Sequence, residues 1–140
     1  MSLSGSTPVI ESAELPTGVR ISYVGKGDRL GVPVLLMPGL GDSWRSFEPV
    51  LHHLPESIHA IALTQRGHGD SSQPVEGYRF HDFAMDLMAF VDALDLEAAV
   101  IVAHSASGFF AQRFAIDHPE RTMGLVLIGS RHPPKPSTCA

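Results

Sequence analysis

Hydrophobic residues along the chain fall into short runs with two different spacings. Residues 19–25 alternate between apolar and polar side chains, and this period of two predicts a half-buried strand. Four further runs are mostly continuous apolar stretches: residues 32–37, 57–63, 99–103 and 124–128. A short run that is apolar on both faces is typical of a central strand in a parallel sheet.

Stretches with helical spacing separate these runs. Apolar residues recur at steps of three and four over residues 80–94, and shorter patterns predict helices at 44–54 and 106–117. Strands that alternate with helices imply crossover connections, so we expect an α/β fold whose sheet is mostly parallel, with helices on both faces. The expected organisation is a flexible segment at 1–18, a core at 19–130 and an irregular tail at 131–140.

Composition narrows the classes of function. The 140 residues are 44% hydrophobic, which suffices for one domain with its own core, and the formal net charge of −5 offers no footprint for nucleic acid or anionic membrane. The longest apolar run, residues 98–103, falls far short of the ~20 that a membrane helix needs, and residues 1–16 show no signal-peptide pattern. The single Cys139 allows neither an internal disulfide nor a cysteine zinc site. We therefore expect a cytoplasmic protein that needs no metal.

The turn at residues 102–108 carries the most chemical information. In open parallel sheets, chemistry sits at the carboxyl ends of the strands, and here a strand leads directly into a helix. Such a sharp turn holds its central residue, Ser105, in a strained backbone conformation with the side chain thrust outward. The positions two before and two after it have to be small, and they are Ala103 and Ser107.

Four segments in this order resemble the α/β-hydrolase fold superfamily over about residues 19–130, its N-terminal half. They are Leu36-Met37-Pro38-Gly39-Leu40-Gly41-Asp42-Ser43, Arg66-Gly67-His68-Gly69-Asp70-Ser71, His104-Ser105 with Gly108, and Ala115-Ile116-Asp117-His118-Pro119-Glu120-Arg121. The family usually has His-Gly where this chain has Pro38-Gly39. A bracing role for that histidine side chain is therefore in doubt here.

The resemblance implies a serine hydrolase of the esterase type, without cofactor or metal. Ser105 is then the nucleophile that forms an acyl-serine intermediate with a small ester-like substrate. The backbone N–H groups of Leu40 and Ala106 form the oxyanion hole. Ser107 is the rival nucleophile, but Phe109 would then occupy a position that has to be small. A serine at 105 argues against the epoxide-hydrolase and haloalkane-dehalogenase branches, which resemble this family but use Asp there.

The triad acid and histidine of the family are not identifiable. Asp117 and His118 lie at the wrong end of the helix after Ser105, and His132 is the one candidate base near the end of the last strand. We therefore interpret the chain as the N-terminal half of a serine hydrolase that can be inactive alone. Its last strand would leave an open sheet edge that favours self-association.

Several alternatives stay open from the sequence. The chain is either an enzyme, a receptor-like homologue that keeps the pocket without turnover, or a lyase or cofactor-free perhydrolase on the same fold. Trp44 and Phe47 either wall an acyl pocket or begin a helix against the core. His68 either lines the pocket or is an exposed loop histidine. His59 is expected to be packed or solvated rather than a metal ligand.

Overall fold

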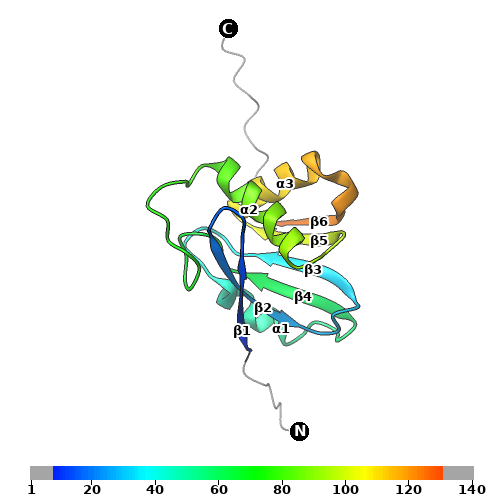
Figure 1. Ribbon diagram of the computed structural model, residues 1–140. Coiled ribbons are helices and arrows are strands. Elements are labelled where there is room, and N and C mark those ends of the chain that lie inside the picture. Colours follow the sequence, from blue (N-terminus) through cyan, green and yellow to red (C-terminus); the bar gives the residue numbers. More distant parts are fainter. Residues whose placement is uncertain (1–7, 131–140) are drawn as a thin grey trace.

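The computed structural model describes residues 8–130, which form one mixed six-stranded sheet with helices on both faces (Figure 1). The strand order is β1-β2-β4-β3-β5-β6. The strands are β1 (Ile10–Glu14), β2 (Arg20–Lys26), β3 (Val32–Met37), β4 (Ile58–Leu63), β5 (Ala99–His104) and β6 (Thr122–Ile128). The helices are η1 (Trp44–Phe47), α1 (Glu48–Leu51), α2 (Phe80–Ala93), α3 (Ser107–Asp117) and η2 (Pro119–Arg121).

The expected α/β fold with a mostly parallel sheet is confirmed. Strands β4, β3, β5 and β6 are parallel to one another, whereas β2 is antiparallel to both β1 and β4. Parallel strands that follow one another in the chain require crossover connections, and helices supply them between β3 and β4, β4 and β5, and β5 and β6. The carboxyl ends of the four parallel strands therefore meet at one edge of the sheet.

Two elements differ from the expectation. Strand β1 (Ile10–Glu14) lies within the segment that we expected to be flexible. Its small and charged residues give no clear alternation of apolar and polar side chains, and the strand forms by pairing with β2. The helix expected at 44–54 is shorter: a 3-10 turn, Trp44–Phe47, leads into the single α-helical turn Glu48–Leu51. Residues 1–7 and the expected tail, 131–140, lie outside the described residues.

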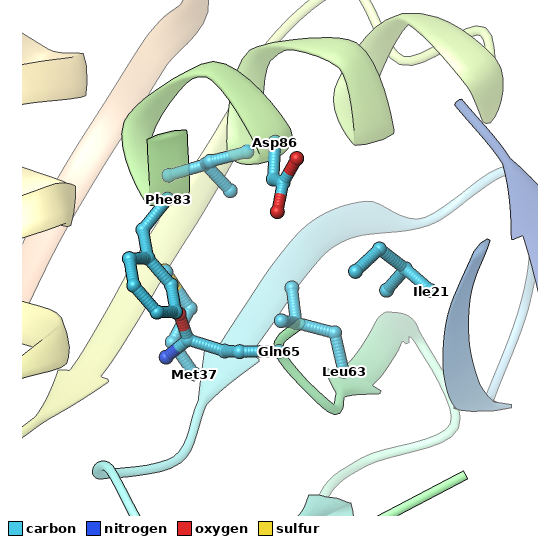
Figure 2. Close-up of a pocket in the computed structure, with 7 residues that line it drawn as sticks. Ile21, Met37, Leu63, Gln65, Phe83 and Asp86 are labelled. Carbon is cyan, nitrogen blue, oxygen red and sulfur yellow. The ribbon is translucent and has the colours of Figure 1, made fainter. Parts of the chain in front are cut away.

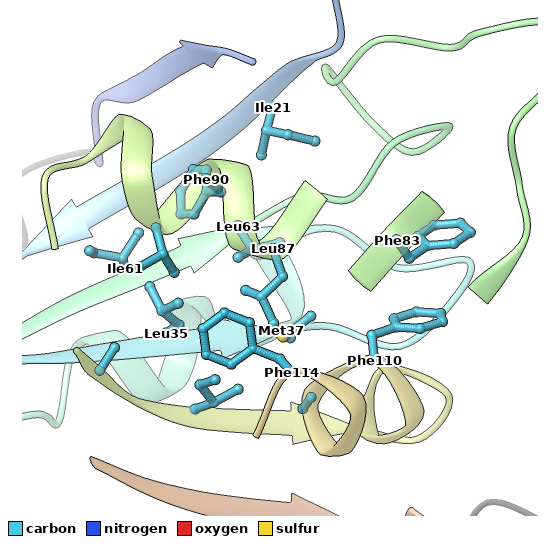
Figure 3. Close-up of a cluster of buried hydrophobic side chains, with 14 of the residues drawn as sticks. Ile21, Leu35, Met37, Ile61, Leu63, Phe83, Leu87, Phe90, Phe110 and Phe114 are labelled. Carbon is cyan, nitrogen blue, oxygen red and sulfur yellow. The ribbon is translucent and has the colours of Figure 1, made fainter. Parts of the chain in front are cut away.

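The larger core packs α2 and α3 against one face of the sheet. Figure 2 shows Ile21, Met37 and Leu63 of the sheet lining one pocket together with Phe83 of α2. Figure 3 shows the same layer extended by Phe110 and Phe114 of α3. Phe83 and Phe110 stack with ring centroids 4.7 Å apart, which joins the two helices. No helix in residues 8–130 is long and apolar enough to cross a membrane.

The smaller core lies on the opposite face, beneath η1 and α1. Trp44, Phe47 and Leu51 are buried there against β3 and β4. Trp44 and Phe47 therefore belong to the core, the second of the two interpretations left open by the sequence. Strand β6 contrasts with the central strands β3, β4 and β5 because its side chains from Leu125 to Ile128 are all exposed.

Candidate active site

Ser105 stands at the bend between β5 and α3. Its φ is 55°, in the left-handed region that residues other than glycine rarely adopt. Its backbone N–H donates to the Ile128 carbonyl at 2.9 Å, and its carbonyl accepts from Gly108 N–H and from Ser130 Oγ. Its side chain is exposed, and its Oγ has no hydrogen-bond partner within residues 8–130. The strained, outward-facing bend expected from the sequence is present.

The turn after β3 lies against this bend. A Cβ placed on Gly39 would come within 3.2 Å of His104 Nδ1 and 3.5 Å of Ser105 Cβ, so only glycine fits here without a shift. The backbone N–H groups of Leu40 and Ala106 make no hydrogen bond to any other described residue. Ala106 also opens α3, whose positive N-terminal end favours negative charge. Two backbone N–H groups without a partner among the described residues therefore adjoin Gly39 and Ser105 in the chain.

A buried polar cluster ties three turns together beneath the serine. Ser107 is fully buried, and its Oγ donates to the Pro38 carbonyl. Gln65 Nε2 donates to the same carbonyl at 3.1 Å and to Ser107 Oγ. Ser107 is therefore inaccessible and committed to structure, which removes it as a rival nucleophile. Figure 2 shows Gln65 on the turn after β4, beside Met37.

An ion pair of Arg66 and Asp86 holds the turn after β4 against α2. Arg66 Nε and Nη2 donate to Asp86 at 2.6 and 2.7 Å, and both residues are 6% exposed. Arg66 Nη1 also donates to the Gly77 carbonyl. The hydrogen bonds to Asp86 raise the pKa of Arg66, so the guanidinium stays charged. A bidentate, buried pair of this kind fixes the turn in one orientation.

Comparisons with known proteins identify the family. A family model described as the alpha/beta hydrolase fold matches residues 32–139. The chain belongs to the α/β-hydrolase fold family. The match includes the four segments on which the resemblance in the sequence rests.

The relatives of this chain are named after several different activities. Epoxide hydrolase 4 of Mus musculus is 30% identical over 119 residues, covering 84% of this chain and 33% of that protein. Non-heme chloroperoxidase of Streptomyces lividans is 35% identical over 120 residues, covering 83% and 43%. The 2-hydroxymuconate semialdehyde hydrolase of Pseudomonas sp. (strain CF600) is 31% identical over 134 residues, covering 93% and 47%. The chain thus spans between 33% and 47% of the length of these relatives.

Solved structures share the fold of this chain. A structure described among novel epoxide hydrolases from metagenomes of hot environments superposes with a TM-score of 0.86 at 25% identity, covering 91% of this chain and 44% of that one. A bacterial membrane phospholipase A superposes with a TM-score of 0.85 at 26% identity, covering 93% and 43%. Both likenesses cover less than half of the longer chain.

The candidate site contains the residues expected from the sequence and three others that the sequence analysis did not predict. Ser105, Leu40 and Ala106 lie on adjoining turns, whereas Asp117 and His118 lie at the far end of α3. His132 lies outside the described residues. The functions of Gln65, Arg66 and Asp86 in holding the turns were not foreseen. The one signal for them in the sequence is a glutamine and an arginine directly after an apolar strand. Burial of an unpaired polar side chain costs free energy, so these two residues require partners there.

Proposed function

We propose that Ser105 is the nucleophile of a serine hydrolase that cleaves a carboxylic ester or similar acyl bond. The observation that carries this proposal is the exposed serine at φ 55° beside the unbonded N–H groups of Leu40 and Ala106. Mutational data on other enzymes put one such donor at roughly 3 kcal/mol of transition-state stabilisation. Backbone strain at a single residue costs about 1–3 kcal/mol and persists where it serves a site.

The chemistry follows from these positions. A base takes the proton from Ser105 Oγ, the oxygen attacks the substrate carbonyl, and the oxyanion accepts hydrogen bonds from Leu40 and Ala106. Collapse expels the alcohol, which takes up the proton, and water then releases the acid from the acyl-serine. No base contacts Ser105 Oγ within residues 8–130, and His132 remains the candidate from the sequence. No cofactor or metal takes part in the proposed reaction.

The serine at position 105 supports acyl transfer over the other activities named among the relatives. Family resemblance implies Asp as the nucleophile of epoxide hydrolases, and this chain has Ser105 at that place. Serine forms an ester with an acyl group that water can cleave, which suits acyl transfer. The relative named as a 2-hydroxymuconate semialdehyde hydrolase, at 31% identity, is therefore a better guide to chemistry than the epoxide hydrolase at 30%.

A fluorophosphonate probe with peptide mapping tests the nucleophile. We expect the 140-residue chain to be labelled at Ser105, and Ser105→Ala to abolish labelling. Ser107→Ala, the matched variant in the same turn, should still be labelled at Ser105. His132→Ala should slow labelling if His132 is the base. Folded protein without any labelling would favour the receptor-like homologue, which binds but does not turn over.

A perhydrolase is the second candidate, because non-heme chloroperoxidase of Streptomyces lividans is 35% identical over 120 residues. Acetic acid would then acylate Ser105 with release of water, and hydrogen peroxide would take the acyl group from Ser105 to give peracetic acid. Peracid formation that Ser105→Ala removes would favour this candidate. Ester cleavage without peracid would favour the hydrolase.

The proposed setting is the cytoplasm, with a small-molecule substrate and a second copy of the chain as partner. Strand β6 ends the sheet of the described residues, so its free edge can pair with β6 of another molecule. Val126→Lys, at a side chain 46% exposed on this strand, should shift the chain toward monomer in light scattering. Val50→Lys, 43% exposed on α1, is the matched control. A monomer before any substitution would contradict self-association.

A further inference from the structure

The turn that carries Leu40 is held by three residues of the neighbouring turn after β4. Gln65 Nε2 donates to the Pro38 carbonyl, and Thr64 Oγ1 accepts from Trp44 N–H at 3.0 Å. Between these anchors, His68 Nε2 accepts from Gly41 N–H at 2.8 Å. Of these three hydrogen bonds, the one to His68 is made by Gly41, the residue directly after Leu40.

The geometry of this turn makes the contact selective. Asp42 N–H donates to the Gly39 carbonyl at 3.1 Å, which closes a β-turn with Leu40 and Gly41 at its centre. Gly41 has φ +89°, the value that the third position of a type II turn requires. A type I turn would rotate the central Leu40–Gly41 peptide and direct Gly41 N–H away. His68 can accept this hydrogen bond only while the type II turn is present.

A second contact sets the tautomer of His68. Its Nδ1 lies 2.9 Å from the Arg66 carbonyl, which can only accept, so Nδ1 carries the proton. Nε2 is then left with a lone pair, as the bond from Gly41 N–H requires. The Arg66 carbonyl is in turn fixed because the Arg66 side chain is anchored on Asp86.

We infer that His68 is a positioning residue: as the Nδ1–H tautomer it selects the type II turn and so fixes the backbone of Leu40 beside Ser105. This inference rests on the proposed function in so far as Leu40 N–H serves the oxyanion. This function of His68 also offers a replacement for the histidine that the family usually has where this chain has Pro38. His68, from the next turn, then braces the turn that carries Leu40. The function of His68 is exerted through Gly41, not on the substrate.

Nitrogen-15 NMR of the full chain tests the tautomer and the contact together. Wild type should show a protonated Nδ1 and an unprotonated Nε2 on His68. His68→Phe removes the acceptor, and exchange of the Gly41 amide should become roughly tenfold faster, as expected for one lost hydrogen bond. In His68→Gln the side-chain oxygen can accept in place of Nε2, so exchange should return to within about twofold of wild type. His53→Gln, at an exposed histidine after α1, is the matched control.

Fluorophosphonate labelling then links the contact to Ser105. His68→Phe should label several-fold more slowly than wild type, with the rate rescued in His68→Gln. A wild-type Nε2–H tautomer, unchanged Gly41 exchange in His68→Phe, or failure of His68→Gln to restore it would each overturn the inference. If wild type is not labelled at all, the proposed function fails, while the tautomer and the Gly41 exchange still decide the placement of His68. If His68→Phe does not fold, the wild-type tautomer and His68→Gln decide it.

Discussion

The two ends of the sheet differ in whether their buried polar groups are hydrogen-bonded. At the carboxyl ends of the parallel strands, Gln65, Ser107 and the pair Arg66–Asp86 are buried, and each makes hydrogen bonds. At the other end, a cavity of about 390 Å³ lies between the β1–β2 hairpin and the end of α2. There the buried Nδ1 of His59 has no hydrogen-bond partner within residues 8–130.

This difference shows where the fold requires a fixed geometry. A satisfied polar network in a low-dielectric interior specifies one arrangement of the turns it connects, because each alternative leaves a group unpaired. The turns that surround Ser105 are connected in this way. At the opposite end, the pair of Arg29 and Glu11 beside the cavity is largely exposed, and the buried Nδ1 of His59 has no partner among the described residues, so the polar groups there specify the packing less.

The largest predicted effect comes from breaking the buried pair. Asp86→Ala leaves the Arg66 guanidinium buried without its carboxylate, which should lower the free energy of unfolding by about 3–5 kcal/mol. Urea denaturation measures this change. Asp92→Ala, on the same helix, is the matched control because it breaks the pair with Arg121 at a side chain 58% exposed. That control should cost about 1 kcal/mol or less.

Equal losses for Asp86→Ala and Asp92→Ala would break the comparison, since both aspartates pair with an arginine and differ chiefly in burial. Fluorophosphonate labelling of the folded fraction adds a second readout. Asp86→Ala should slow labelling more than Asp92→Ala, because Arg66 also places the carbonyl that orients His68.

A smaller effect should follow from removing one hydroxyl of the network. Ser107→Ala leaves the Pro38 carbonyl bonded to Gln65, so no group becomes wholly unpaired. The loss should be about 1 kcal/mol in urea denaturation. Ser46→Ala removes an exposed hydroxyl that bonds the Ser43 carbonyl, and it should cost less than about 0.5 kcal/mol. Matching values for the two serines would indicate that the cluster at Pro38 adds nothing beyond a surface contact.

Much of the fold could be predicted from the sequence because apolar patterning dominates it. The sequence predicts strand β3 at its observed bounds from a continuous apolar run, and helix α2 to within one residue from apolar residues at steps of three and four. Strand β1 was missed because its residues, Ile10–Glu14, alternate too weakly and gain stability only by pairing with β2. The antiparallel direction of β2 depends on that pairing as well, which no local pattern encodes.

The candidate site was predictable only in part, for a related reason. Ser105 was recognisable because the sharp bend restricts its neighbours to small residues, a local constraint. The contacts of Gln65, His68 and Arg66 join segments that lie far apart in the sequence, so their partners could not be deduced from spacing. Asp86 in particular looks like an ordinary polar residue of α2 until its burial is known.

The smallest predicted effect concerns His59 and its dependence on pH. Burial, the largest cause, lowers the pKa of His59, and nearby Arg29 lowers it further while Asp28 and Glu11 oppose this. Above about pH 6.5, the imidazole is neutral in both the folded and the unfolded chain, so it brings no pH dependence. As the pH falls below that value, His59 becomes protonated in the unfolded chain while it is still neutral in the folded chain. Protonation therefore favours unfolding.

His59→Leu should therefore leave the free energy of unfolding at neutral pH unchanged or slightly higher, because it removes a polar atom that has no partner. Relative to wild type, this variant should gain stability as the pH is lowered, which urea denaturation across a pH series measures. His53→Leu, at an exposed histidine, should run parallel to wild type over the same series. A His59→Leu variant that is clearly destabilised at neutral pH would mean that this end of the sheet also holds its polar side chain in a needed contact, and the contrast with the carboxyl end would no longer stand.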